Sequence, residues 1–204
     1  MEHKANKDIS EEDFLTMADA LFGEYMTTRP EIHEDARERA REEFLEMCAN
    51  GYRRDPSYHV EAAEQYQKSE CYGVKIKGFP DRIEKDDEGN YLIADFKTGR
   101  HNKHDPNDPL TCLQVLLYAF MTQKELGLDV KYCQYRYPRF GYEVTCPYDD
   151  ENKDKLSIYM TQFRKALEEG KFPCAEKEKQ DKACRYCRYA SICGQESEGV
   201  QDEE

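Results

Sequence analysis

Residues 78–84 read GFPDRIE and residues 91–99 read YLIADFKTG, and these two stretches decide the fold. Both have the apolar pattern of strands, and residues 86–90 between them read DDEGN, a composition that favours a tight turn. Because side chains alternate along a strand, Asp95 and Lys97 share one face, and the predicted hairpin brings Asp81 alongside them. Two carboxylates and an ammonium on one face can hold a hard divalent cation and orient a water molecule on it. The hairpin therefore predicts phosphodiester hydrolysis.

Two further patterns follow the hairpin along the chain. Gln114 and Tyr118 lie four residues apart, which places them on one face of a helix predicted from Asp108 to Gly127. Near the C-terminus, Cys184 and Cys187 are separated by two residues, and Cys193 follows after five more. Three thiols at such spacing predict a metal site.

These motifs resemble those of the PD-(D/E)XK nucleases, and within them the RecB/AddB type. The matching elements are G-x-x-D-R-I at residues 78–83, D-x-K-T-G at residues 95–99, Q-x-x-x-Y at residues 114–118 and the cysteine run. The resemblance covers residues 60–194. A D-x-K triplet alone is weak evidence because it occurs by chance, whereas four elements in the family order are specific.

The proposed metal ligands are the carboxylates of Asp81 and Asp95, which would bind Mg²⁺ or Mn²⁺. The alternative is that these are surface charges at strand ends. The resemblance adds the backbone carbonyl of Phe96 as a further ligand. It also implies a histidine from an early helix, for which His33 is the candidate, although a solvent-facing histidine is the alternative. Glu64 lies where the family often carries another acid, and a solvated helix face explains it equally well.

Lys97 is expected to position the attacking water or to neutralise developing charge. The resemblance implies that Gln114 and Tyr118 line the active-site groove and touch the DNA backbone. The alternative is a core aromatic with an incidental neighbour. Arg100 and Lys103 follow the site directly and are candidate DNA-binding residues.

The cysteine run resembles the iron–sulfur knot of AddB-type and CRISPR-adaptation nucleases, which implies a [4Fe–4S] cluster. Zinc takes the same thiolates and is the alternative. Cys184, Cys187 and Cys193 provide three ligands. Cys174 is favoured as the fourth because a short loop costs less entropy to close than a long one. Cys48 is the alternative fourth ligand, since relatives take their first cysteine from far upstream. The other cysteines are expected to be buried apolar residues.

Composition bounds the class of protein. The chain of 204 residues is long enough for one core, and its hydrophobic content of 38% with 36% charged residues requires a very polar surface. No apolar run reaches the length of a membrane span and no signal-peptide pattern is present, so an intracellular, soluble protein is expected. The net charge of −13 argues for weak unaided affinity for DNA but not against the chemistry.

The predicted fold is α/β: a restriction-endonuclease-like mixed sheet flanked by helices, with a C-terminal cysteine-rich metal knot. Residues 1–9 are expected to be disordered. Residues 10–194 form one nuclease domain, with a helical part at 10–58, a core at 60–170 and the cysteine cluster at 171–194. Residues 195–204 form an acidic tail. Helices are expected from Ser10, from Pro30 to Cys48 and from Asp149 to Gly170, whereas residues 61–72 are ambiguous between helix and strand.

The expected function is that of a Mg²⁺- or Mn²⁺-dependent deoxyribonuclease, an exonuclease on single-stranded ends that serves recombination, repair or phage DNA processing. No Walker A pattern occurs, so any motor would be a separate helicase partner. The alternative is a non-catalytic DNA-end-binding module of a helicase–nuclease complex. Asp81, Asp95 and Lys97 argue against it because a pure binder does not need that triplet.

Overall fold

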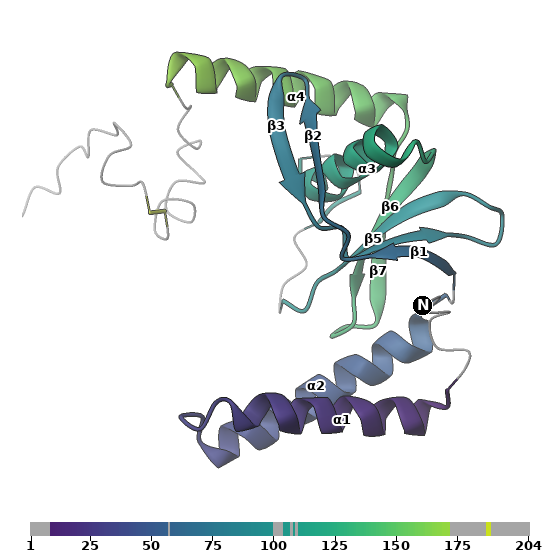
Figure 1. Cartoon of the computed structure of the whole chain (residues 1–204), viewed down its shortest axis with the longest axis vertical. Helices are drawn as coiled ribbons and strands as arrows, with labels where there is room; N and C mark the ends of the chain where they lie inside the picture. Colours follow the sequence, from purple (N-terminus) through teal and green to yellow (C-terminus); the bar gives the residue numbers. More distant parts are fainter. Residues whose placement is uncertain are drawn as a thin grey trace, which may run out of the picture. The chain divides into compact units, whose positions relative to one another are not determined.

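The computed structural model of the chain describes residues 9–56, 58–99, 104–106, 108, 110–171 and 187–188. It divides into two compact units, residues 1–160 and residues 161–204. The elements are, in order, α1 (Glu11–Thr27), α2 (Glu34–Arg54), β1 (His59–Ala63), β2 (Gln67–Cys71), β3 (Val74–Gly78), β4 (Arg82–Lys85), β5 (Tyr91–Phe96), α3 (Leu113–Leu126), β6 (Val130–Tyr137), β7 (Tyr142–Pro147) and α4 (Asp150–Glu169) (Figure 1).

A mixed five-stranded sheet forms the centre of the first unit, with strand order β1-β4-β5-β6-β7. Only β5 and β6 pair in parallel; the other neighbours are antiparallel. Parallel neighbours need a crossover connection, and α3 provides it. A separate hairpin of β2 and β3 lies against α3, which packs on β2, β5 and β6. The expected mixed sheet flanked by helices is therefore present.

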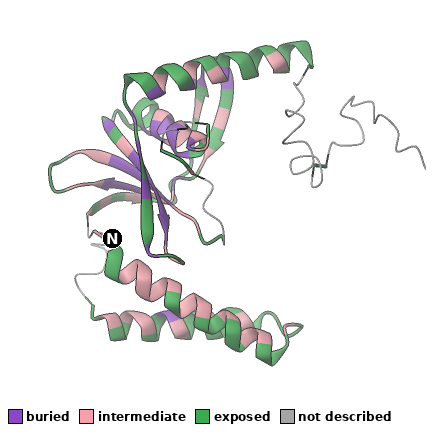
Figure 2. Ribbon diagram, turned by 180° about the vertical axis from the view of Figure 1, so that it is seen from behind, coloured by how far each residue is buried: buried purple, intermediate pink, exposed green. Residues whose placement is uncertain are grey.

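The core lies between α3 and the sheet, where buried residues concentrate (Figure 2). Leu92, Ile93 and Ala94 of β5 are all fully buried, as expected for a central strand covered on both faces. Val115, Leu116 and Ala119 supply the apolar side of α3. This core packs around β5, whose last two residues, Asp95 and Phe96, begin the D-x-K motif.

The predicted hairpin forms between β4 and β5. Its turn is organised by Asp86, whose carboxylate accepts hydrogen bonds from the backbone N–H groups of Glu88 at 3.0 Å and Asn90 at 2.8 Å. Gly89 has a φ of +86°, a conformation that suits glycine. Arg82 pairs with Ala94, so the residue before β4 lies beside the end of β5.

The N-terminal helices differ in part from expectation. Ser10 caps α1 as predicted, with its Oγ accepting from the backbone N–H of Asp13 at 3.1 Å. The second helix was expected at Pro30–Cys48 but runs from Glu34 to Arg54. Turn hydrogen bonds occupy the residues after Pro30, and the helix continues to the residue before Asp55, where Pro56 disfavours further helix.

Two other boundaries also shift. The helix expected from Asp108 begins at Leu113, because the Oγ1 of Thr111 bonds to the backbone oxygens of Asp105 and Asp108 and holds a turn there. The ambiguous span 61–72 contributes to strands β1 and β2, joined by a turn in which Glu64 has a φ of +47°. Helix α4 begins after Asp149, whose carboxylate accepts from the backbone N–H of Asn152 at 2.9 Å.

In the second unit, residues 161–169 form the last part of α4, which ends before Gly170 with a φ of +65°. Residues 187–188 are also described there. Across the described part of the chain, no helix is both long and apolar enough to span a lipid bilayer.

Candidate active site

The two acids of the hairpin meet at the end of β5. The backbone N–H of Phe96 donates to Oδ2 of Asp81 at 2.7 Å, which ties Asp81 to the residue between Asp95 and Lys97. Asp95 is almost fully buried, with 2% of its surface exposed. The hairpin register thus brings the two carboxylates to one edge of the sheet, as the alternation of side chains predicted.

Lys97 lies directly beside this pair. Its Nζ is 2.5 Å from Oδ2 of Asp95 and donates to Oε1 of Gln114 at 2.8 Å. The same ammonium lies 5.2 Å from the ring centroid of Tyr135, within the range of a cation–π interaction. Lys97 is therefore held from three sides in a partly buried position.

Gln114 and Tyr118 share one face of α3, and that face meets the hairpin. Nε2 of Gln114 donates to the hydroxyl of Tyr118 at 3.1 Å. Tyr118 lies so close to Gly78 that a Cβ there would be 2.5 Å from its ring. A glycine at this position is what allows α3 to approach β3 closely. The contacts Asp95–Lys97–Gln114–Tyr118 form one continuous chain.

The electrostatics suit a cation. Burial raises the pKa of Asp95, the ion pair with Lys97 opposes that rise, and the charge of Asp81 adds to it. Oδ2 of Asp95 is buried and, apart from Lys97, has no hydrogen-bond partner in the described part of the chain. Carboxylate oxygens in this state fit Mg²⁺ or Mn²⁺, which are bound through one or two carboxylates together with waters and phosphate oxygens.

Two predicted ligands stand apart from this cluster. His33 precedes α2 with 81% of its side chain exposed, and its ring nitrogen is 3.8 Å from Asp35. Glu64 donates its backbone N–H to the carbonyl of Asp81 at 3.1 Å, but its side chain is exposed. Within the described residues no three His, Cys, Asp or Glu side chains gather as metal ligands, so neither His33 nor Glu64 completes a group with Asp81 and Asp95.

Sequence reasoning missed a buried charge network behind Phe96. Arg136 donates to both oxygens of Glu84, at 2.9 and 2.6 Å, and Arg82 donates to Glu84 at 3.2 Å and to Asp55 at 2.8 Å. Burial opposes the charge of Arg82, but the two carboxylates raise its pKa overall. The signal available in the sequence was Arg136 itself, which follows Tyr132, Cys133 and Tyr135.

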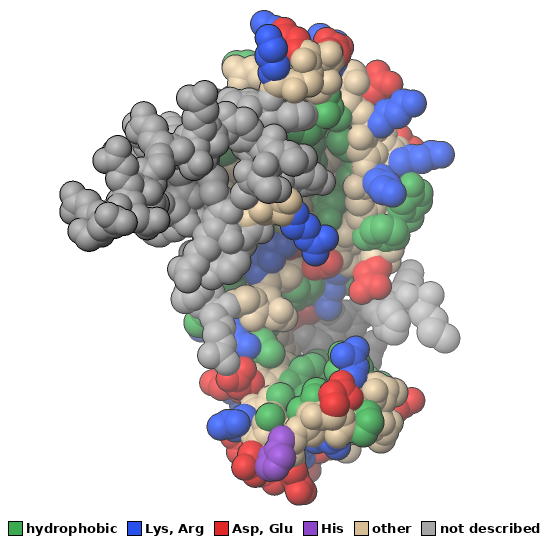
Figure 3. Space-filling model, turned by 90° about the vertical axis from the view of Figure 1, so that its left-hand side faces the viewer, with side chains coloured by type: hydrophobic (Ala, Val, Ile, Leu, Met, Phe, Trp, Pro, Cys, Tyr) green, Lys and Arg blue, Asp and Glu red, His purple; other side chains and the backbone are tan. Residues whose placement is uncertain are grey.

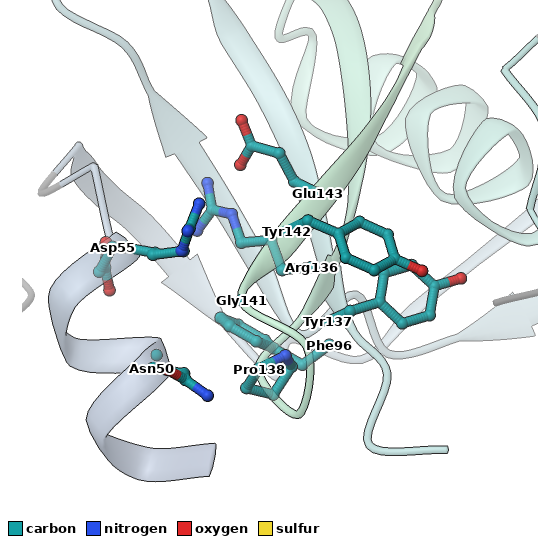
Figure 4. A pocket seen from close by; sticks show the side chains of 11 residues that line it. Asn50, Asp55, Phe96, Arg136, Tyr137, Pro138, Gly141, Tyr142 and Glu143 are labelled. Carbon is teal, nitrogen blue, oxygen red and sulfur yellow. The ribbon is translucent and has the colours of Figure 1, made fainter. Parts of the chain in front are cut away.

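Two arginines of this network, Arg82 and Arg136, contact the ring of Phe96 and so help to position the site. The guanidinium carbons of Arg82 and Arg136 lie 5.0 and 5.8 Å from the ring centroid. Phe96, Arg136 and Asp55 line a cavity of about 450 Å³, into which α2 and the β6–β7 hairpin also project residues (Figure 4). Because the backbone N–H of Phe96 binds Asp81, fixing this ring also fixes the first carboxylate.

Tyr135 is a second residue that the sequence did not reveal. It is buried under Lys97, and the ring of His104 stacks on it with a centroid distance of 3.6 Å. Burial raises the pKa of Tyr135 well above its usual range, so the phenol stays neutral. Five consecutive residues at the end of β6 are buried, so the sequence around Tyr135 shows no alternation that would single it out.

Several candidates fall outside the described residues: Arg100, Lys103, Cys174, Cys184 and Cys193. Cys187 is described and its thiol is exposed. Cys48 is half-buried in α2. The remaining cysteines are buried, as expected: Cys71, Cys112, Cys133 and Cys146.

Comparison with known proteins identifies the family of the chain. The model of the PD-(D/E)XK nuclease superfamily matches residues 2–194. Among solved structures, the chain is similar to one described as "Crystal structure of SSO0001", with 17% identity, a TM-score of 0.39, and coverage of 91% of this chain and 85% of that chain. No curated protein matches. Since the family model covers nearly the whole sequence, the chain belongs to the PD-(D/E)XK nuclease superfamily.

Proposed function

We propose that the protein is a Mg²⁺- or Mn²⁺-dependent DNA nuclease, an exonuclease that acts on single-stranded ends in recombination, repair or phage DNA processing. Membership of the superfamily supports nuclease activity and a nucleic-acid substrate. One observation supports the metal-dependent chemistry: Asp81 and Asp95 meet at the end of β5, with Lys97 held 2.5 Å from Asp95.

In this proposal Asp81, Asp95 and the carbonyl of Phe96 hold the metal. When bound, the metal acts as a Lewis acid on the scissile phosphate and lowers the pKa of a coordinated water. The chain's own contribution is positional. The N–H of Phe96 orients Asp81, and burial keeps water away from Asp95. Fixed groups in a site from which water is excluded stabilise charge more strongly than mobile ones.

Lys97 stabilises the negative charge that develops on the phosphate, or positions the attacking water. Gln114 accepts a hydrogen bond from the ammonium and sets its direction. Tyr118 orients Gln114 in turn and faces the DNA backbone. Mutual support of this kind is what holds a catalytic group within the narrow tolerance that hydrolysis needs.

The finer assignment is to the RecB/AddB type, with a [4Fe–4S] cluster bound by Cys174, Cys184, Cys187 and Cys193. The motif order in the sequence supports it, and zinc is the alternative occupant. Arg100 and Lys103 are proposed to bind DNA just beyond the site. The sequence has no Walker A pattern, so in this proposal the chain works either as a stand-alone nuclease or beside a separate helicase partner.

Degradation of end-labelled single-stranded DNA tests the proposal. Purified protein should shorten a 5′-labelled oligonucleotide in Mg²⁺ or Mn²⁺ and leave it intact in EDTA, and a 3′-labelled copy gives the polarity. Asp95→Ala serves as the inactive control. A protein that binds DNA ends but cleaves no strand in either metal would be the non-catalytic end-binding module instead.

A further inference from the structure

A second groove opens beside the proposed catalytic residues. Its volume is about 640 Å³, which lies within the usual range of roughly 300–1,000 Å³ for ligand sites. Gln114, Tyr118 and Tyr135 line it, so it is continuous with the chain of contacts that reaches Lys97. The opposite wall comes from β3 of the β2–β3 hairpin, which lies beside α3 (Figure 1).

The rim of this groove is basic. Lys75 and Lys77 of β3 line it and are exposed. Neither side chain makes an ion pair or hydrogen bond with any residue that the structure describes. Lys68 pairs with Lys77 across the hairpin and adds a third exposed ammonium, while Glu70 faces Lys75 as the one nearby acid of the hairpin ladder.

The charge of the groove contrasts with that of the whole chain. The net charge of the protein is −13, yet none of the described residues that line the groove is Asp or Glu. Two uncommitted lysines without a lining carboxylate create a local positive potential that attracts phosphate. An acidic protein that binds DNA needs such a local site.

The interior of the groove is apolar. Ile76, Leu113 and Leu117 line it together with the rings of Tyr118 and Tyr135. Leu110 also lines it and leaves 56% of its surface exposed. Single-strand-binding proteins combine these two features, a cationic rim for the backbone and apolar or aromatic surface for unpaired bases.

We infer that this groove binds a single DNA strand on its way to the proposed catalytic site, with Lys75 and Lys77 on the phosphates and unpaired bases against the apolar wall. The inference rests on the proposed function for the identity of the strand as substrate. It goes beyond that function by assigning the binding surface to the β2–β3 hairpin and by requiring unpaired bases.

Binding measurements in EDTA test the inference apart from cleavage. Three fluorescent probes are used: dT20, an abasic 20-mer and a 20-base-pair duplex. Binding of the full chain to each probe is measured by fluorescence anisotropy. Lys75→Gln/Lys77→Gln is compared with Arg39→Gln/Lys124→Gln, which removes two exposed charges that do not line the groove. We expect the first pair to raise the Kd for dT20 about 10-fold and to reduce the salt slope by about 1.4, and the control pair to stay within about 2-fold.

Leu110→Ser tests the apolar wall. This substitution should weaken the binding of dT20 about 3- to 10-fold and leave the binding of the abasic strand unchanged, because only dT20 has bases to contact the wall. Equal effects of the two charge pairs, an unchanged Kd in the Lys75/Lys77 pair, or a duplex bound as tightly as dT20 would each overturn the inference. Cleavage in Mg²⁺ is scored separately. If the protein does not cleave DNA but shows the expected binding effects, only the proposed function is refuted. If it cleaves DNA but lacks those binding effects, only the groove inference is refuted.

Discussion

At the scale of single residues, the site depends on three side chains in different environments. Asp81 is anchored by a backbone N–H, Asp95 is buried, and Lys97 is held by contacts with Asp95 and Gln114. Each environment restricts the side chain to one position. In the proposed site the three side chains act together, so the loss of one should abolish the activity that depends on all three.

Asp81→Ala, Asp95→Ala and Lys97→Ala should each lower nuclease activity at least about 100-fold while the protein stays folded. The two acid variants lose a metal ligand, and the lysine variant loses charge stabilisation worth several kcal/mol in comparable sites. Initial rates on labelled single-stranded DNA, with circular dichroism as a check on folding, measure this. Asp87→Ala, in the exposed turn of the same hairpin, is the matched control and should cleave normally. Normal cleavage by Asp95→Ala would refute the assignment.

The raised pKa of Asp95 has a consequence for stability. Because burial raises this pKa in the folded state above the unfolded value, the folded protein binds the proton more readily. The contribution of Asp95 to the free energy of unfolding is therefore greatest below the ordinary aspartate pKa, and it falls as the pH rises through the raised value.

Urea unfolding of wild type and Asp95→Asn without metal, from pH 3.5 to 7.5, measures this contribution as a difference. The free energy of unfolding of wild type should fall relative to that of Asp95→Asn as the pH rises. Above the raised pKa of Asp95, the difference between the two proteins should stay constant. A difference that grows in the opposite direction would show that the ion pair with Lys97 outweighs burial.

At the scale of elements, the site is built where α3 meets the two hairpins. Gly78 ends β3 just where Tyr118 of α3 crosses it. Helix α3 brings Gln114 to Lys97, and this depends on the distance between helix and strand. A single methyl group at the crossing point should therefore affect the site.

Gly78→Ala should lower the free energy of unfolding by about 1–3 kcal/mol, because the added Cβ overlaps the ring of Tyr118 and forces it to move. Activity should fall too, since Tyr118 orients Gln114. Gly23→Ala is the matched control: it lies within α1 with no atom near the added Cβ, and should stabilise the protein by about 0.5–1 kcal/mol. Thermal unfolding and initial rates report both effects; equal behaviour of the two variants would contradict the close approach.

At the scale of the whole molecule, charge is the dominant feature. Acidic and basic side chains are interspersed over the face seen in Figure 3, without one large basic surface. Phosphate would therefore meet only scattered basic side chains among the described residues of this face, although the family implies a nucleic-acid substrate. The affinity of the protein should depend on local cations and not on the overall field.

The salt dependence of DNA binding should consequently be shallow. With about two to four phosphates neutralised, the slope of log K against log salt should lie near −1.5 to −3 for single-stranded DNA. Anisotropy titrations between 50 and 300 mM salt, at fixed pH and in EDTA, give this slope. A value of the size seen for proteins that make many phosphate contacts would mean that the basic surface is larger than inferred.

The proposed iron–sulfur cluster would join cysteines from distant parts of the sequence if Cys48 were its fourth ligand. Protein purified without oxygen should be brown and contain iron. Cys174→Ser should bleach it and lower its melting temperature, because closed clusters need four thiolates. Cys48→Ser is the matched control and should keep both colour and iron. The reverse result would assign the fourth ligand to α2, and colourless protein with stoichiometric zinc would replace iron by zinc.

The sequence by itself determined the β4–β5 hairpin and the family. Turn chemistry at residues 86–90 and the two-residue period of strands are local rules, so they place Asp81, Asp95 and Lys97 together without further information. The helical period did the same for Gln114 and Tyr118. The starts of α2 and α3 were missed because turn hydrogen bonds at residues such as Thr111 compete with helix in ways that apolar spacing does not show, whereas α3 ends at Gly127 as predicted.

Tertiary structure alone decided the rest. Three features join residues far apart in the sequence. Arg136 contacts the ring of Phe96, Gly78 contacts Tyr118, and the lysines of β3 line one groove together with α3. No local propensity encodes such contacts. The contacts of α3 arise because the parallel pairing of β5 with β6 carries this helix across the sheet, which brings Tyr118 against Gly78 and Gln114 against Lys97.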